Sequence, residues 1–153
     1  MKTVMKKVAA IVLVSATVLS LAACSKKAKK LTAAEFKTKM ESEGYSVSEA
    51  VEEDGASAVL ATNEAGTVSI GHMTFADKDT SQKYFDSLKS IYDLAKGQEG
   101  MKISTSSTKL TVESDETYGV MILAEDTMIS ASAQPATDEN IDACKSALKA
   151  LGY

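Results

Sequence analysis

Arginine and tryptophan are absent from this 153-residue sequence, which also has only one His, one Pro and two Cys. Binding to nucleic acid depends on Arg and Lys contacts with phosphates. From Leu31 onward the chain has 10 Lys against 21 Asp and Glu, a formal net charge of −11. We therefore expect no nucleic-acid partner. We interpret the acidic surface as one that keeps the domain soluble, and the alternative is that it repels the domain from anionic lipid.

The single His restricts acid–base and nucleophilic catalysis, because any Ser-His-Asp or Cys-His mechanism would have to use His72. His72 falls in a predicted strand, two residues after Ile70 and on the same face of the sheet. We expect a hydrogen-bonded structural or surface His. The alternative is that Gly71 marks a β-bulge that turns the imidazole elsewhere.

Clusters of metal ligands and glycine-rich phosphate loops are also lacking, so we expect no metal and no cofactor. The sequence Asp77-Lys78-Asp79 resembles the opening of a calcium loop, but the later ligands and the Gly of such a loop are missing. We predict instead that Asp79 caps a helix and that the acidic residues 52–54 form a solvated turn. With no Trp and only eight Phe and Tyr residues, a sugar-binding cleft is disfavoured, and we expect no enzyme activity.

The N-terminus has the order of charged and apolar residues of a secretory signal. Lys2, Lys6 and Lys7 are followed by residues 8–23, which carry no charge. As a helix this run would rise about 24 Å, which is short of the roughly 30 Å hydrocarbon core of a bilayer. A cleaved signal peptide over residues 1–23 is therefore favoured over a transmembrane anchor.

The apolar run ends in Leu21-Ala22-Ala23-Cys24, which resembles the lipobox of bacterial lipoproteins. That resemblance implies cleavage between Ala23 and Cys24 and a diacylglycerol thioether on Cys24. It places the protein at the cell membrane, lipid-anchored on the extracytoplasmic face, with the membrane as its first partner. The alternative is an ordinary secretory signal followed by a chance Cys.

Residues 24–30 have no apolar pattern and are predicted to be a tether between the lipid and a single domain at residues 31–153. Four of these residues are basic: Lys26, Lys27, Lys29 and Lys30. Each could add about 1 kcal/mol of attraction to anionic lipid. A merely solubilising spacer is the alternative.

The second Cys, Cys144, has no partner within the chain if lipid occupies Cys24. It lies between Ile141 and Leu148 on the apolar stripe of a predicted helix. We expect a small buried core residue, with a reactive or pairing thiol as the alternative.

The rest of the chain alternates between helical and strand patterns. Thr32 with Glu35 predicts a capping box for a helix that ends near Glu43, with Gly44 as its C-cap. Further helices are predicted from Asp79 to Gly97 or Gly100 and over residues 138–151. The first of these is expected to bury an apolar face of residues at three- and four-residue spacing: Tyr84, Phe85, Leu88, Ile91, Tyr92 and Ala95. Strands are predicted over residues 45–51, 56–62, 67–75, 101–105, 109–113, 118–124 and 128–133.

These elements predict an α+β fold, a two-layer sandwich in which an antiparallel sheet of about six or seven strands packs against three helices. An antiparallel sheet can leave one face in solvent, and that face would be a natural binding surface. A shift of 60 residues aligns Leu88 with Leu148 and Ile91 with Leu151, which suggests a duplicated strand-strand-helix unit. Chance similarity between two amphipathic helices is the alternative.

The segments Asp126-Thr127-Met128-Ile129 and Leu151-Gly152-Tyr153 resemble small surface lipoproteins of Gram-positive bacteria to which no activity is assigned. We expect a non-catalytic binding or interaction module of the cell envelope, whose partner would be an envelope protein, a peptide or a wall component. The alternative is a small envelope enzyme or ligand carrier that uses His72 with nearby carboxylates.

Overall fold

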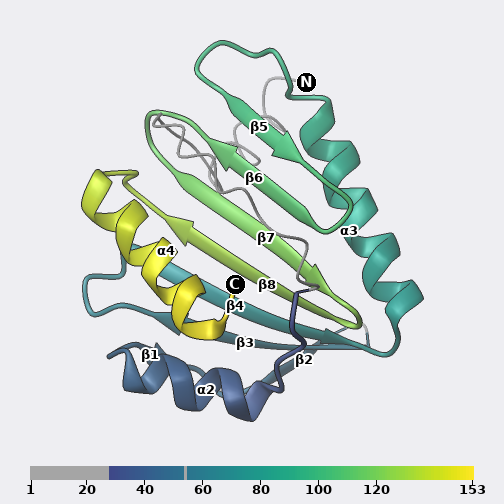
Figure 1. The fold of residues 1–153 in the computed structure, drawn as a ribbon, viewed down its shortest axis with the longest axis vertical. Helices are drawn as coiled ribbons and strands as arrows, with labels where there is room; N and C mark the ends of the chain where they lie inside the picture. Colours follow the sequence, from purple (N-terminus) through teal and green to yellow (C-terminus); the bar gives the residue numbers. More distant parts are fainter. Residues whose placement is uncertain (1–27, 54) are drawn as a thin grey trace.

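The computed structural model describes residues 28–53 and 55–153, which form one antiparallel sheet and three helices (Figure 1). In chain order the elements are α2 (Ala33–Ser42), β1 (Ser46–Val47), β2 (Val51–Glu53), β3 (Ala56–Thr62), β4 (Val68–Phe75), α3 (Lys78–Asp93), β5 (Lys102–Thr105), β6 (Lys109–Glu113), β7 (Tyr118–Ala124), β8 (Thr127–Ala133) and α4 (Asp138–Leu151). The predicted α+β class, an antiparallel sheet packed against three helices, is confirmed.

The strands follow the order β1-β3-β4-β8-β7-β6-β5, and β2 also pairs with β3. The centre of the sheet joins the two halves of the chain, because β4 pairs with β8 from Val68 opposite Ala133 to Thr74 opposite Thr127. Ala124 pairs with Thr127, so the predicted turn at Glu125 and Asp126 makes a two-residue hairpin. Short hairpins of this kind favour antiparallel neighbours.

Helix α2 begins at the predicted cap, Thr32, and its C-cap lies one position earlier than predicted, because Glu43 rather than Gly44 occupies that position. The Thr32 side chain accepts a hydrogen bond from the Glu35 backbone N–H, and the Glu35 carboxylate accepts one from the Thr32 N–H at 2.8 Å. At the other end Gly44 has a φ of +85°, which a side chain would disfavour, and Tyr45 donates its N–H to the Met40 carbonyl. The capping box and this left-handed Gly hold both ends of the helix.

Both predicted ends of α3 are wrong, because Asp77 rather than Asp79 occupies the N-cap position and the helix ends at Asp93, before Gly97. The Asp77 carboxylate accepts a hydrogen bond from the Thr80 N–H at 2.7 Å, while Asp79 lies in the first turn. That bond lowers the pKa of Asp77. Either carboxylate suits a helix N-terminus, so the charge pattern alone did not distinguish the two positions.

The first predicted strand, at residues 45–51, is also wrong, because the chain there forms a two-residue strand, β1, a break, and then β2, which continues to Glu53. At the break the Ser48 hydroxyl accepts a hydrogen bond from the Leu60 N–H at 3.1 Å. The Ser48 N–H in turn donates to the Leu60 carbonyl at 2.8 Å. A Ser side chain therefore replaces part of the backbone ladder at this edge of the sheet.

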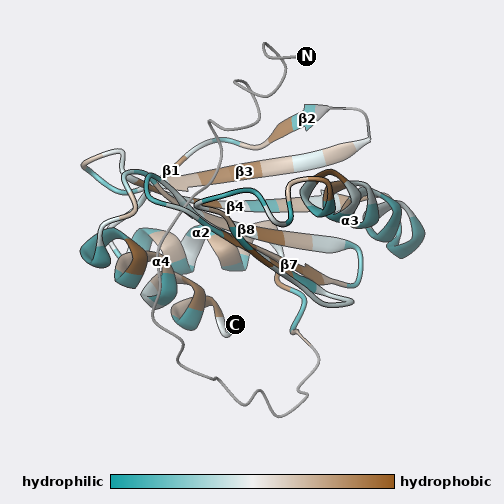
Figure 2. Cartoon of the chain, turned by 90° about the horizontal axis from the view of Figure 1, so that it is seen from above, coloured by the Kyte–Doolittle hydropathy of each residue, from teal (hydrophilic) through white to brown (hydrophobic). Residues whose placement is uncertain are grey.

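Helices cover both faces of the sheet, as the alternation along β4 shows. Val68 and Ile70 belong to a core cluster under α2 and α4, whereas Met73 and Phe75 belong to a second cluster under α3. Figure 2 shows α2 and α4 on one side of the strands and α3 on the other. The expectation that one face of the sheet stays in solvent is therefore wrong, because helices pack on both faces.

The two halves share a strand-strand-helix order, but the helices that the suggested duplication relates lie on opposite faces of the sheet. Leu148 and Leu151 are buried, whereas Ile91 is 48% exposed. The 60-residue alignment therefore does not relate equivalent packing positions.

Candidate functional site

The residues that carry the predicted lipid anchor, Ala23, Cys24, Lys26 and Lys27, lie outside the described residues. The described chain starts at residue 28, with the second half of the predicted tether. Lys29 and Lys30 are exposed and lie in this part.

Residues 28–31, which we call the anchor-proximal segment, lie against the domain. Leu31 is 1% exposed and packs in the same core cluster as Phe36. Its backbone carbonyl accepts a hydrogen bond from Nε2 of His72 at 2.8 Å. One buried apolar side chain and one buried hydrogen bond therefore fix the end of the segment to the sheet.

Two further contacts hold the segment ahead of Leu31. Nζ of Lys30 lies 2.7 Å from the carboxylate of Asp126, in the β7–β8 turn, and this contact lowers the pKa of Asp126. The Tyr153 hydroxyl donates to the backbone carbonyl of Lys29. Burial raises the pKa of Tyr153 to about 12. The segment is thus joined to the β7–β8 hairpin and to the C-terminus of the domain.

The structure places His72 inside the protein, where it is 1% exposed. Its ring packs against Phe36 with 5.3 Å between ring centroids. Nε2 donates to the Leu31 carbonyl, so the imidazole links β4 to the anchor-proximal segment inside the protein. Nδ1 is buried with no hydrogen-bond partner among the described residues. This confirms the structural interpretation of His72.

No β-bulge occurs at Gly71, because the pairing of β4 with both neighbouring strands is uninterrupted there. The structure gives another reason for a Gly at position 71. A Cβ atom at this position would lie 2.5 Å from the Ser130 hydroxyl oxygen, on the strand opposite. Gly71 makes room for Ser130 and does not redirect His72.

Cys144 is fully buried on α4, as expected, and packs in the cluster under α2 and α4. Burial raises the pKa of its thiol to about 12. The thiolate, which is the nucleophilic form, is therefore suppressed at neutral pH.

The acidic residues do not assemble into a cation site within the part of the chain that the structure describes. No group of three His, Cys, Asp or Glu residues there is placed to hold a metal ion. Asp77 serves as a helix cap. The predicted turn at residues 52–54 is wrong for its first two residues, because Glu52 and Glu53 lie in β2, where Glu52 is exposed, and Asp54 lies outside the described residues.

Five large apolar side chains are exposed in the described chain, and all of them lie on the α3 side of the sheet. Two come from β2 and β3, two from α3 and one from its C-cap: Val51 (60% exposed), Leu60 (48%), Tyr84 (42%), Ile91 (48%) and Leu94 (86%). Val51 is assigned to this side because it pairs with Ala58, which pairs with Met73 of the α3 cluster. Leu60 lies two positions after Ala58 in the same strand, so its side chain is on the same side. Single exposed apolar residues are common, whereas several on one side mark a candidate interaction surface.

Sequence reasoning missed this surface, because Tyr84 and Ile91 were expected in the core. Helix α3 buries Phe85 and Tyr92, as expected, but its third buried residue is Ser81. Ser81 faces inward because its hydroxyl donates to the backbone carbonyl of Glu125 in the β7–β8 turn. A signal was present in the spacing, since positions 81, 85 and 92 share one helix face, but it required a Ser to be counted as a packing residue.

A comparison of the chain with protein-family models and with curated proteins finds no match. Within the described residues, no helix has the length and apolar character needed to cross a membrane.

Proposed function

We propose that this chain is an extracytoplasmic lipoprotein, anchored to the cell membrane through lipid on Cys24, whose domain is a non-catalytic binding module of the envelope. The observation that carries the proposal is the sequence Leu21-Ala22-Ala23-Cys24 after a charged start and an uncharged run. A diacylated Cys supplies enough buried methylene groups for stable anchoring, at about 0.8 kcal/mol each.

The two residues best suited to catalysis support a non-catalytic role. His72 is tied to the Leu31 carbonyl inside the domain, and Cys144 is a neutral thiol in the core. A general base or nucleophile must reach the reacting atom of a substrate, and neither side chain lies at the surface.

The exposed apolar side chains on the α3 side support binding to a protein or a peptide. Interface cores are enriched in aromatic and large aliphatic residues, and Tyr84 and Ile91 lie on the same outer part of α3, seven positions apart. Contacts with a wall polysaccharide would depend more on polar groups and stacked aromatic rings.

The anchor is tested by the intact mass of the detergent-extracted protein and by its distribution between membrane and soluble fractions. We expect the wild type to begin at Cys24, to carry the mass of acyl chains and to remain with the membrane. The Cys24→Ala form should be unlipidated and should leave the membrane, whereas Cys144→Ala, the matched control, should remain there. An unmodified soluble wild type would overturn the proposal.

The binding role is tested with a photo-crosslinking residue placed at Leu60 or at Ile91 in living cells. Ser146, exposed on α4, is the control position. The proposal expects the same protein or peptide to be captured from Leu60 and Ile91, with little capture from Ser146. Equal capture from all three positions would indicate non-specific contact and would contradict a binding role for the α3 side.

A further inference from the structure

We propose that the sheet face bearing the anchor-proximal segment is turned toward the membrane and contacts anionic lipid headgroups through Lys29, Lys102 and Lys109, so that the α3 side points away from the membrane. This inference rests on the proposed lipid anchor at Cys24. It assigns an orientation and a lipid-contacting surface to the anchored domain.

The first argument is the length of chain between the lipid and the fixed segment. Three residues lie between Cys24 and residue 28, and the four steps of a fully extended chain span at most about 3.6 Å each, or about 14 Å in all. A domain of about 125 residues has a radius of gyration of about 14 Å and is roughly 35 Å across. The connection is too short for the domain to turn its far side to the bilayer.

The second argument is the place where the fixed segment lies. His72 and Leu31 belong to the sheet face that α2 and α4 partly cover, since Val68 and Ile70, on the same face of β4, pack in the cluster under these helices. Figures 1 and 2 both show the described chain beginning in front of β7 and β8, on the side of α4 and opposite α3. The anchor therefore leaves the domain from this face.

The third argument is the charge on the part of this face that the helices leave uncovered. Residues paired on neighbouring strands have their side chains on the same face of the sheet. Lys109 pairs with Ile122, which pairs with Ile129, which pairs with His72. Lys109 therefore lies on the same face as His72, whose imidazole is hydrogen-bonded to the anchor-proximal segment. Lys102 lies on the same face, opposite Glu113. Both Lys side chains are exposed.

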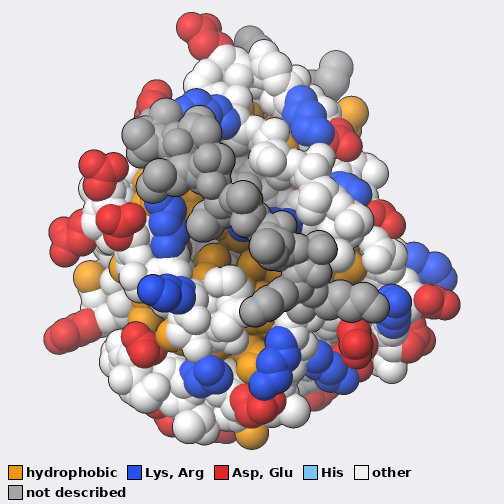
Figure 3. Space-filling view, in the orientation of Figure 1, with side chains coloured by type: hydrophobic (Ala, Val, Ile, Leu, Met, Phe, Trp, Pro, Cys, Tyr) orange, Lys and Arg blue, Asp and Glu red, His pale blue; other side chains and the backbone are white. Residues whose placement is uncertain are grey.

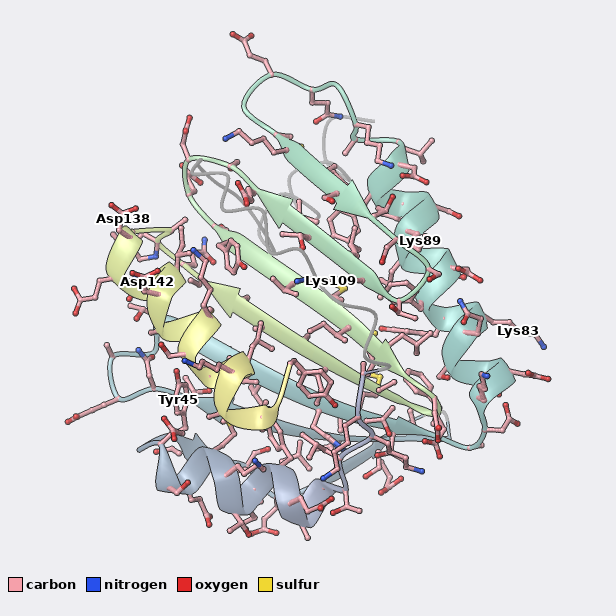
Figure 4. All side chains as sticks on the ribbon, viewed as in Figure 1. Tyr45, Lys83, Lys89, Lys109, Asp138 and Asp142 are labelled. Atoms are coloured by element: carbon pink, nitrogen blue, oxygen red, sulfur yellow. The ribbon has the colours of Figure 1, made fainter. Side chains whose placement is uncertain are left out.

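The figures agree with this assignment. Figure 4 places Lys109 near the middle of the face, with Asp138 and Asp142 at the far end of α4 and Lys83 and Lys89 on α3 at the opposite edge. In Figure 3 most Asp and Glu side chains lie near the outline of this view, while several Lys side chains lie nearer its centre.

Negative groups on the same side limit the attraction, including Asp138 and Asp142 on α4, which covers part of this face. Asp126 is neutralised by Lys30 at 2.7 Å, and Glu113 lies opposite Lys102. Lys29 and Lys109 add to the charge of Lys26 and Lys27, which the sequence places within four residues of Cys24.

The orientation is tested with the full-length lipidated protein in vesicles of phosphatidylcholine, with and without phosphatidylglycerol. A fluorophore is attached at Ser104→Cys on β5, on the proposed membrane side, or at the matched Ser87→Cys on α3. Both positions are exposed, whereas Cys144 is buried. With a quencher on the lipid headgroups, we expect at least threefold more quenching at position 104. Equal quenching, or more at position 87, would overturn the orientation.

The role of charge is tested by adding Lys109→Glu to the Ser104→Cys protein, with Lys83→Glu on α3 as the control of equal charge change. One Lys near an anionic surface strengthens membrane binding about fivefold. Lys109→Glu should therefore lower the quenching of the label at position 104 in anionic vesicles and leave it unchanged in neutral ones. An equal effect of Lys83→Glu would overturn the assignment of Lys109 to the lipid.

Failure of the orientation and failure of the anchor give different results. If intact mass shows no lipid on Cys24 and the protein does not sediment with vesicles, the proposed function fails and the orientation falls with it. If the protein is lipidated and sediments with vesicles but both labels are quenched equally, the orientation alone is wrong.

Discussion

Nε2 of His72 donates a hydrogen bond to the backbone carbonyl of Leu31 at 2.8 Å, across 41 positions of sequence. This bond joins the middle of β4 to the segment that leads toward Cys24. Leu31 is 1% exposed and Phe36, which packs on the imidazole, is fully buried. The only His of the chain therefore helps to hold the anchor-proximal segment on the domain.

Replacing His72 by Ala should lower the free energy of unfolding by about 2 to 4 kcal/mol. The substitution removes a buried ring that packs on Phe36 and leaves the Leu31 carbonyl without its donor. Urea unfolding of the wild type and the variant measures the loss. Tyr84→Ala, at a 42% exposed ring, is the control and should cost less. A change of under about 0.5 kcal/mol for His72→Ala would show that the hydrogen bond from His72 to the Leu31 carbonyl does not stabilise the fold.

The free energy of unfolding of the domain should fall at alkaline pH, because the Cys144 thiol and the Tyr118 hydroxyl are buried in their neutral forms. Burial raises the pKa of the Cys144 thiol from 9.0 to about 12, and that of Tyr118 from 10.0 to about 12. Below about pH 9 both the folded and the unfolded chain hold the Cys144 proton. Between about pH 9 and 12 only the folded chain keeps it, so the unfolded state gains stability as the pH rises.

Unfolding by urea at about pH 8, 9 and 10 checks this linkage. The Cys144→Ala variant should show a shallower decline over this range than the wild type, because Tyr side chains in the unfolded chain titrate mainly above it. Parallel declines in the two proteins would contradict the proposed contribution of the thiol.

Much of the fold could be predicted from the sequence because its signals are local. The strands from Lys109 to Glu113 and from Tyr118 to Ala124 have the predicted bounds, since turn residues stand between them. The capping box of Thr32 and Glu35 likewise depends on residues three positions apart. Such patterns fix where an element starts and ends.

The parts that could not be predicted depend on contacts between distant residues. Lys30 meets Asp126 across 96 positions, and Tyr153 meets the Lys29 carbonyl across 124. No local pattern identifies such partners, so residues 28–30 could not be recognised as part of the packed surface. Similarly, α3 has two adjacent apolar stripes, and the position of the sheet decides which of them is buried.

Replacing Gly71 by Ala should lower the free energy of unfolding by about 1 kcal/mol or more, because the new Cβ would lie 2.5 Å from the Ser130 hydroxyl oxygen. The effect should depend on Ser130, whose Cβ lies at an ordinary 3.8 Å. In a Ser130→Ala background the same Gly71→Ala change should cost little, since Ala suits a strand better than Gly. A double-mutant cycle by urea unfolding measures the coupling, and additive effects would contradict the close contact.

The two apolar stripes of α3 should differ sharply in their contribution to stability. Phe85 is fully buried under the helix, whereas Ile91 is 48% exposed. Phe85→Ala should therefore cost about 3 to 5 kcal/mol, and Ile91→Ala less than about 1 kcal/mol. Both changes introduce Ala into the same helix, so helix propensity favours both variants and does not explain a difference of this size.

Urea unfolding of the two variants gives the comparison, and the photo-crosslinking yield from Leu60 in the Ile91→Ala protein adds a second readout. If Ile91 contributes to a partner interface, its truncation should lower that yield while the domain stays folded. A loss of stability from Ile91→Ala as large as that from Phe85→Ala would mean that Ile91 belongs to the core. The α3 side would then no longer be a candidate binding surface.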